Sequence, residues 1–137
     1  MVKEIIKDTN VLQTKSIKAT KEDHYIIQDL IDTAEHHKDR CCGLASIQIG
    51  EPKRIIIAYD GQKFMPFINP VIIKRSNEKY KTIESCMSLE GEKEVTRNQK
   101  ITVLHENKSG KKVKLECGGV FAQTIQHEID HCNGVLI

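Results

Sequence analysis

The chain has 137 residues, 39% of them hydrophobic and 29% charged, with a formal net charge of +2. That length suits one domain, and because no repeat or linker interrupts it we expect residues 1–137 to form a single domain. The weak net charge and the scattered lysines argue against nucleic-acid binding, and no apolar stretch is long enough for a signal peptide or a membrane span. We therefore expect a cytoplasmic protein whose five cysteines are thiols or metal ligands rather than disulfides.

The first periodic segment is residues 21–38, where apolar side chains recur at helical spacing between charged ones, which predicts an amphipathic helix. Isoleucine-rich and alternating runs follow, with glycine-containing turns between them, and they predict strands. These strands are expected at 54–60, 65–75, 79–85, 94–106 and 111–117. A last helix from about 119 to 132 makes the fold class α+β, with antiparallel sheets packed around the C-terminal helix.

The last predicted helix carries His127-Glu128-x-x-His131, two imidazoles four residues apart with a carboxylate next to the first. That spacing brings both ring nitrogens within reach of one metal ion, and Glu128 can approach a water molecule without ligating the ion. Residues 133–137 contain no standard metal ligand, and Cys132 projects about 100° away from His131 around the helix. The third ligand is therefore expected upstream of the helix.

Spacing alone leaves several candidates for that third ligand. The upstream donors are Cys41, Cys42, Cys86 and Cys117, with His105 and Glu84 as weaker options. Cys86 directly follows a predicted strand, where a thiolate could be held rigidly, but the spacing does not decide among the four cysteines. A thiolate with two imidazoles leaves one coordination position open, which is typical of a catalytic metal site.

Three segments of the chain together carry a more specific pattern. They are Cys41-Cys42-Gly43-Leu44-Ala45-Ser46-Ile47-Gln48, Glu84-Ser85-Cys86-Met87-Ser88 and Gln126 through Gly134. In order and separation they resemble the peptide deformylase family, whose motifs are Gly-x-Gly-Leu-Ala-Ala-x-Gln, Glu-Gly-Cys-Leu-Ser and Gln-His-Glu-x-Asp-His-x-x-Gly. The resemblance spans nearly the whole chain. It implies a metal-dependent hydrolase that removes the N-formyl group from the initiator methionine of new polypeptides.

The resemblance also implies a role for each matching residue. The implied metal ligands are Cys86, His127 and His131. Glu128 is the implied general acid and base, and the side-chain amide of Gln48 and the backbone N–H of Met87 are the implied donors to the developing oxyanion. The residues implied in substrate binding are Gly43, Leu44 and Glu84. The peptide is expected to pair with this part of the backbone like an added strand.

For the cofactor, the resemblance implies one divalent metal ion. Fe²⁺ is expected first, and Zn²⁺, Ni²⁺ or Co²⁺ are alternatives that two imidazoles and a thiolate also suit. The implied partners are formyl-methionyl nascent peptides, and the ribosome is a candidate place where the protein meets them. The protein is expected to act as a monomer and to contact neither nucleic acid nor a membrane. Two other interpretations stay open: a deformylase-like metal- and peptide-binding protein with weak or lost activity, and a small metallopeptidase or amidase.

Four residues depart from the family motifs, namely Cys41, Ser46, Ser85 and Met87. Ser85 replaces a glycine, so we expect strain there if that backbone has positive φ. Cys41 also replaces a glycine, and we expect its bulk to meet the substrate strand and to slow turnover or alter side-chain preference. Beside these departures, Glu84 and Arg97 are expected either as a supporting ion pair or as two unrelated surface charges, which the sequence leaves equally open.

Overall fold

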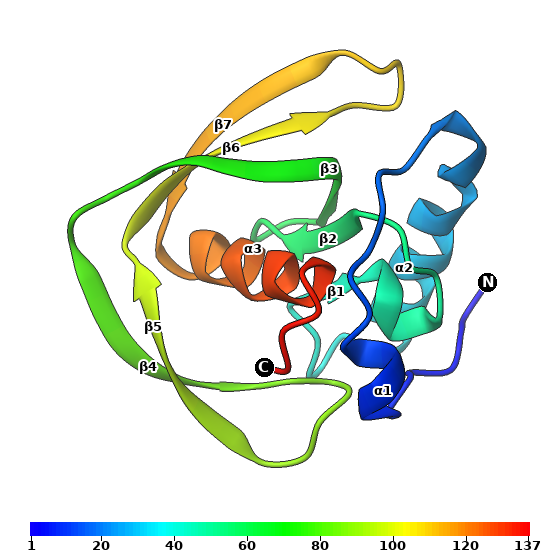
Figure 1. The fold of residues 1–137 in the computed structure, drawn as a ribbon, viewed down its shortest axis with the longest axis horizontal. Helices are drawn as coiled ribbons and strands as arrows, with labels where there is room; N and C mark the ends of the chain where they lie inside the picture. Colours follow the sequence, from blue (N-terminus) through cyan, green and yellow to red (C-terminus); the bar gives the residue numbers. More distant parts are fainter.

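Seven strands form two antiparallel sheets that curve around one helix. The strands are β1 Gly43–Ala45, β2 Ile55–Tyr59, β3 Phe64–Arg75, β4 Lys79–Ser85, β5 Glu92–Asn98, β6 Lys100–Glu106 and β7 Lys112–Gly118. The larger sheet has the order β1-β2-β3-β6-β7, and β4 and β5 form a separate two-stranded sheet. The computed structural model describes residues 1–137, and Figure 1 shows the last helix running through the middle of the molecule inside these strands. The expected α+β fold is confirmed.

The helices are α1 Thr9–Leu12, α2 Tyr25–His36 and α3 Gly119–Cys132, with two 3₁₀ helices, η1 Lys21–Asp23 and η2 Ser46–Ile49. The helix expected over 21–38 is therefore present, but its first turn is 3₁₀, and Asp23 in that turn accepts a hydrogen bond from the backbone N–H of Thr20. Helix α1 was not expected, since four residues are too short to show a period. No helix is long and apolar enough to cross a membrane.

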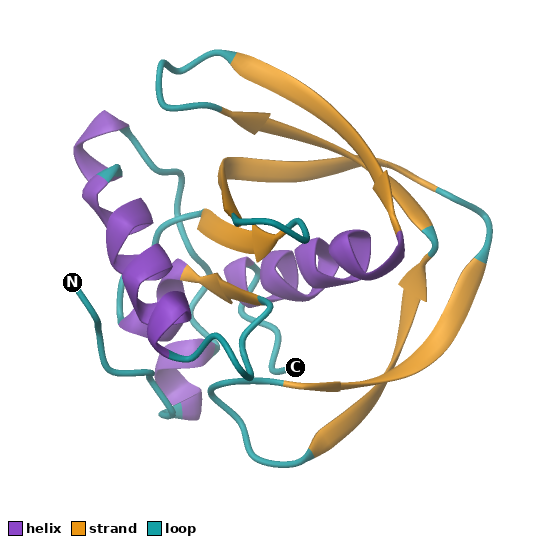
Figure 2. Ribbon diagram, turned by 180° about the vertical axis from the view of Figure 1, so that it is seen from behind, coloured by secondary structure: helices purple, strands orange, loops and turns teal.

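The isoleucine run of β2 is explained by burial on both faces of the strand. Ile56 and Ala58 belong to the core cluster beneath α3, whereas Ile55 and Ile57 belong to the cluster beneath α2. All four side chains are fully buried, and successive side chains in a strand point to opposite faces. Figure 2 shows α2 and α3 on either side of this strand. The arrangement fixes β1, the neighbour of β2, next to α3.

The prediction of one strand over 94–106 is wrong. β5 ends at Asn98, β6 begins at Lys100, and the two strands belong to different sheets. Between the two strands, the side chain of Gln126 on α3 takes both backbone hydrogen bonds of Asn98. Its Oε1 accepts from the N–H of Asn98 at 3.0 Å, and its Nε2 donates to the carbonyl of Asn98 at 3.0 Å. Periodicity along the chain could not locate this change of sheet, since it depends on a contact with a residue 28 positions away.

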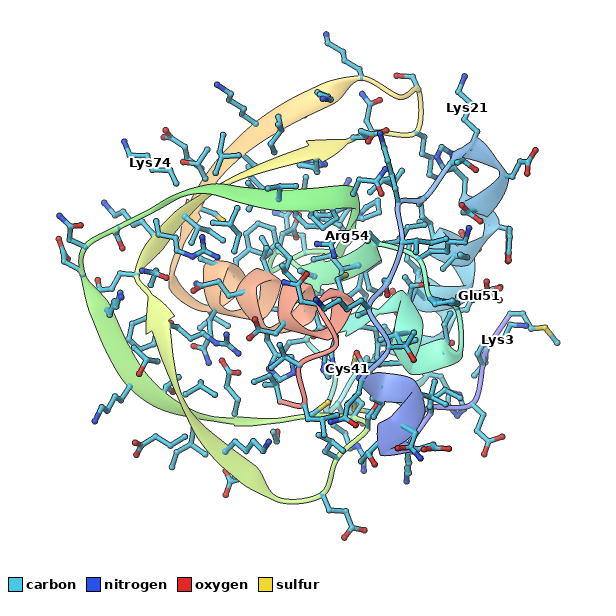
Figure 3. The ribbon with its side chains drawn as sticks, in the orientation of Figure 1. Lys3, Lys21, Cys41, Glu51, Arg54 and Lys74 are labelled. Atoms are coloured by element: carbon cyan, nitrogen blue, oxygen red, sulfur yellow. The ribbon has the colours of Figure 1, made fainter.

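The C-terminal end of α3 is held by Arg54, which precedes β2. Its Nη1 donates to the carbonyl of Cys132 at 3.4 Å and to Oδ1 of Asn133 at 3.0 Å. Figure 3 shows Arg54 beside this end of the helix, where a cation interacts favourably with the helix dipole. Gly134 has φ +76° and lies against the backbone of Gln13, and the helix ends just before it, at the predicted residue 132.

Candidate metal centre

Three potential metal ligands meet where the loop after β4 approaches α3. One donor atom from each of Cys86, His127 and His131 lies within 4.8 Å of the other two. The two histidines are one helical turn apart, with 7% and 0% of their surface exposed, and Nε2 of His131 lies 3.3 Å from Sγ of Cys86. Helical spacing therefore supplies two donors, and the end of β4 brings in a third from 45 residues away.

This donor set fits one divalent ion. Nδ1 of His127 is 2.7 Å from Oε1 of Glu84, which leaves Nε2 free for a metal. Sγ of Cys86 accepts hydrogen bonds from the backbone N–H of Ser88 at 3.4 Å and from Nε2 of Gln48 at 3.5 Å, and these bonds orient the sulfur. Two imidazoles and one thiolate are ligands for borderline-soft ions such as ferrous iron, nickel, cobalt and zinc.

The other cysteines lie apart from this cluster. Cys132, the last residue of α3, is fully buried in the core cluster against which Cys117 also packs. Cys41 is 6% exposed and belongs to the cluster beneath α2, with Sγ 3.3 Å from the carbonyl oxygen of Gly43. Burial raises the pKa of the Cys41 and Cys132 thiols to about 12, so both stay protonated at neutral pH. The geometry therefore favours Cys86 among the cysteines that spacing left open.

Behind His127, the Glu84 carboxylate accepts hydrogen bonds from several side chains. Arg97 donates from Nη2 to Oε1 at 2.6 Å and from Nε to Oε2 at 2.9 Å, and Nε2 of Gln123 donates to Oε2 at 2.9 Å. Nη1 of Arg97 also reaches Oδ2 of Asp130 at 2.7 Å. Glu84 and Arg97 are 8% and 6% exposed, so the supporting ion pair is confirmed.

The charge state of Glu84 follows from these contacts. Burial by itself would raise the pKa of this carboxyl group, but the hydrogen bonds from Arg97 and His127 outweigh burial and lower the pKa to about 2. Both carboxylate oxygens are engaged with these neighbours and Gln123. Glu84 thus lies behind a metal ligand, and its expected part in substrate binding stays a prediction.

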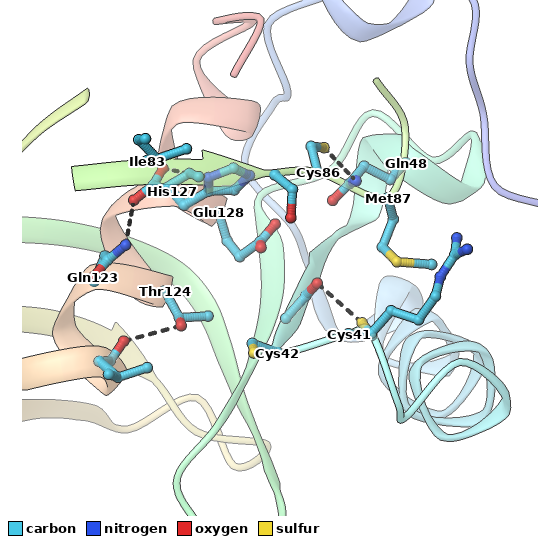
Figure 4. Close-up of a pocket in the computed structure, with 15 residues that line it drawn as sticks. Cys41, Cys42, Gln48, Ile83, Cys86, Met87, Gln123, Thr124, His127 and Glu128 are labelled. Atoms are coloured by element: carbon cyan, nitrogen blue, oxygen red, sulfur yellow. Dashed lines mark hydrogen bonds and ion pairs between the residues drawn. The ribbon is translucent and has the colours of Figure 1, made fainter. Parts of the chain in front are cut away.

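Glu128, which follows His127 in the chain, lies on the wall of a pocket that Cys86 and His127 also line. Its side chain points into the pocket in Figure 4, the residue is 5% exposed, and Oε1 has no hydrogen-bond partner. Burial raises the pKa of Glu128 to about 7, because the effect of burial is larger than the opposing effect of His127, which lowers the pKa. A carboxyl group with a pKa near neutrality can accept and return a proton at physiological pH.

Gln48 and Met87 line this pocket together with Cys86 and His127. Gln48 is 1% exposed, and its Oε1 accepts from the backbone N–H of Ala45 at 2.9 Å, which turns Nε2 towards Oγ of Ser88 at 3.1 Å. Ser88 had no role in the sequence-based prediction. Its place in the second motif was the available signal, and its hydroxyl now explains how the Gln48 amide is oriented.

Gly43 is required by the close approach of β1 to its neighbours. A Cβ atom on this residue would lie 2.7 Å from the carbonyl oxygen of Ile57 and 2.8 Å from Cγ2 of Thr124 on α3. The expected reason for glycine was proximity to the substrate, and the structure adds this second reason. Leu44 is fully buried beneath α2, so its side chain belongs to the core and its expected part in substrate binding stays a prediction.

The two glycine replacements fit the fold without backbone strain. Asn69, with φ +51°, is the one residue other than glycine with positive φ, so the strain considered for Ser85 is absent. Most of the bulk of Cys41 lies in the core, and Cys42 is the exposed cysteine on the pocket wall. The obstruction expected at Cys41 is therefore small.

Comparison with known proteins identifies the family of this site. The sequence profile described as polypeptide deformylase matches residues 2–137. This chain belongs to the polypeptide deformylase family. A peptide deformylase from Clostridium beijerinckii is 43% identical over 137 residues, which cover 100% of both chains. One from Carboxydothermus hydrogenoformans is 36% identical over 99% of this chain and 84% of that one.

A solved structure agrees with this assignment. The crystal structure of peptide deformylase from Thermotoga maritima matches with a TM-score of 0.91 at 30% identity, covering 99% of this chain and 95% of that chain. Deformylases are hydrolases that remove the N-formyl group from nascent polypeptides. The cluster of Cys86, His127 and His131 is consistent with the one metal ion that this reaction needs.

Proposed function

We propose that this deformylase holds its metal ion with Cys86, His127 and His131 and uses Glu128 as general acid and base. The observation that carries the proposal is the buried Oε1 of Glu128, which has no partner and belongs to a residue that lines the same pocket as Cys86 and His127. A structural metal site has no need of such a group. With a pKa of about 7, Glu128 can take up and release a proton within one turnover at neutral pH.

A divalent ion at this site supplies Lewis-acid chemistry, which lowers the pKa of water and polarises the formyl oxygen. Glu128 accepts a proton from the attacking water as the water oxygen bonds to the formyl carbon. The same carboxyl group then donates that proton to the peptide nitrogen as the C–N bond breaks, releasing a free amine and formic acid, which ionises to formate. Nε2 of Gln48 and the backbone N–H of Met87 donate to the oxyanion. Glu84 holds Nδ1 of His127 and so fixes its ring.

The substrate peptide is proposed to pair with the free edge of β1. This strand is hydrogen-bonded to β2 on one side and ends the larger sheet on the other, so its second edge has no strand partner, and Gly43 lies on the pocket wall. Ile83 and Val120 line the pocket and are 61% and 73% exposed, which suits contact with an apolar methionine side chain.

The finer features of the proposal rest on the donor set and on the family. Fe²⁺ is the ion proposed for the cell, with Zn²⁺, Ni²⁺ or Co²⁺ able to replace it. The substrates are formyl-methionyl nascent peptides, met at the ribosome, which places the reaction in the cytoplasm. The protein acts as a monomer without nucleic-acid contact. Residues 1–137 form one catalytic domain, because the donors come from the end of β4 and from α3, and both β4 and α3 contact β5.

The test is an assay of anaerobically purified protein, loaded with Fe²⁺ or Ni²⁺, for formate released from formyl-Met-Ala-Ser. Wild-type protein with about one metal per chain is expected to release formate. Glu128→Ala should lower kcat by a factor of about 10² to 10⁴ with metal content unchanged. Cys86→Ala should abolish metal binding, whereas the matched variants Cys117→Ala and Cys132→Ala should retain it. Wild-type protein that is fully loaded and releases no formate would overturn the proposal.

The same assay addresses the two alternative functions. The case for lost activity rested on the residues at positions 41 and 85, and neither introduces backbone strain. A deformylase should leave unformylated Met-Ala-Ser intact. Cleavage of that peptide at a rate similar to deformylation would favour a metallopeptidase instead.

A further inference from the structure

Gln123 lies one helical turn before His127 on α3 and belongs to none of the three motifs. Its side chain lines the metal pocket and donates from Nε2 to Oε2 of Glu84 at 2.9 Å, a bond marked in Figure 4. The hydroxyl of Tyr80 donates to Oε1 of Gln123 at 3.0 Å. An amide whose oxygen is occupied by a donor must present its NH₂ group to the carboxylate. Tyr80 therefore sets which end of Gln123 faces Glu84.

Gln123 and His127 lie on one face of α3 and both hydrogen-bond to the Glu84 carboxylate. Residues four apart on a helix are neighbours, and these two contact different oxygens of Glu84, Oε2 and Oε1 respectively. Arg97 contacts both oxygens from the neighbouring strand, but it also binds Asp130. Gln123 thus gives the carboxylate a second attachment to α3, which limits rotation of the group that holds Nδ1 of His127.

Tyr80 reaches this network from the sheet of β4 and β5. It lies four residues before Glu84 on β4, so both side chains project from the same face, and it pairs with Arg97 across the two strands. Burial raises the pKa of Tyr80, so its hydroxyl remains protonated and able to donate at neutral pH. In the network that ends at His127, its contact is with Gln123.

We propose that Gln123 and Tyr80 are positioning residues for the metal centre. Tyr80 orients the Gln123 amide, Gln123 steadies the Glu84 carboxylate, and Glu84 keeps the proton of His127 on Nδ1 so that Nε2 faces the metal. Partners of this kind behind a metal ligand commonly change metal affinity. The inference rests on the proposed ligand set.

The test measures how fast Ni²⁺ leaves the loaded protein in excess chelator. Gln123→Leu is expected to release the metal about ten-fold faster than wild type, at the low end of the range for residues behind a ligand, because it acts through Glu84. Tyr80→Phe should release it about three-fold faster, since it loosens the amide without removing it. The double variant should be no faster than Gln123→Leu alone, because Tyr80 acts through Gln123.

Two matched controls separate positioning from general destabilisation. Gln28→Leu removes an exposed hydrogen bond to Asp32 on α2, and Tyr25→Phe removes an exposed hydrogen bond to Glu51. Both should release Ni²⁺ at the wild-type rate. A second readout is the absorption spectrum of the Co²⁺-loaded protein, which reports ligand geometry and should change in Gln123→Leu and in neither control.

The outcomes distinguish this inference from the ligand assignment. Loss of metal binding in Cys86→Ala with wild-type release rates in both network variants would overturn the roles of Gln123 and Tyr80 alone. Additive effects in the double variant would overturn the path through Gln123. Metal binding that survives Cys86→Ala would overturn the ligand set itself. Tyr80→Phe deletes a single oxygen, so it keeps the test decisive even where Gln123→Leu fails to fold.

Discussion

Replacing Arg97 with methionine is expected to lower the free energy of unfolding by about 3 kcal/mol. Removing one partner of a buried ion pair costs about 3–5 kcal/mol, because the remaining charge is left without compensation. The lower end applies here, since Glu84 keeps His127 and Gln123 as partners and the Asp130 side chain is 29% exposed. At about 2.1 cal/mol/K per residue, 137 residues have an unfolding entropy of about 290 cal/mol/K. The melting temperature should therefore fall by about 10 °C.

Thermal unfolding of the metal-free protein, followed by circular dichroism, measures this change. Lys53→Met is the matched control, because it removes a cation whose Nζ lies 3.4 Å from Oδ2 of Asp23 in a more exposed pair. That pair should contribute less than about 1 kcal/mol. If Arg97→Met lowers the melting temperature no more than Lys53→Met does, the burial argument for Arg97 is refuted.

The effect should also depend on pH with a definite sign. The pKa of Glu84 is lowered to about 2 in the folded chain from an ordinary value of 4.5. The ion pair therefore stabilises the fold fully above about pH 4.5, and this contribution is lost as the pH falls towards 2. The difference between wild type and Arg97→Met should narrow over that window. A difference that stays constant from pH 6 to pH 3 would contradict the assigned pKa.

Two further changes test the packing of the sheet and the core. Gly43→Ala should lower the free energy of unfolding by about 1–3 kcal/mol, because the added Cβ would meet Ile57 and Thr124. Urea unfolding measures this change, and an unchanged urea midpoint would contradict it. His105 is 5% exposed against Phe67, with neither ring nitrogen bonded, and burial lowers its pKa. Wild type should therefore lose stability as the pH falls below about 6.5. In melting temperatures taken from pH 8 to pH 5, His105→Leu should depend less on pH than wild type. Melting temperatures of the two proteins that fall in parallel would refute this role of His105.

Local patterns in the sequence were enough to predict most elements of this fold. The helical period of residues 25–36 and the helix that ends at Asn133-Gly134 follow from interactions between near neighbours, which a linear pattern records. The boundary at Gln99 did not follow. Residues 96–99 are all polar, so hydrophobic periodicity marks no boundary there. The change of sheet depends on Gln126, whose amide meets the backbone of Asn98 only after α3 packs.

Residue types and their spacing were enough to predict the chemistry of the site: two histidines on one helical face, a carboxylate beside them, and a need for a third donor from upstream. How those groups are arranged and supported follows from the folded chain. Burial in the fold raises the pKa of Glu128 towards neutrality, and the end of β4 brings Cys86 to His131. Such effects come from contacts between residues distant in the chain, and spacing along a sequence carries no information about the solvent or the neighbours that folding brings to a side chain.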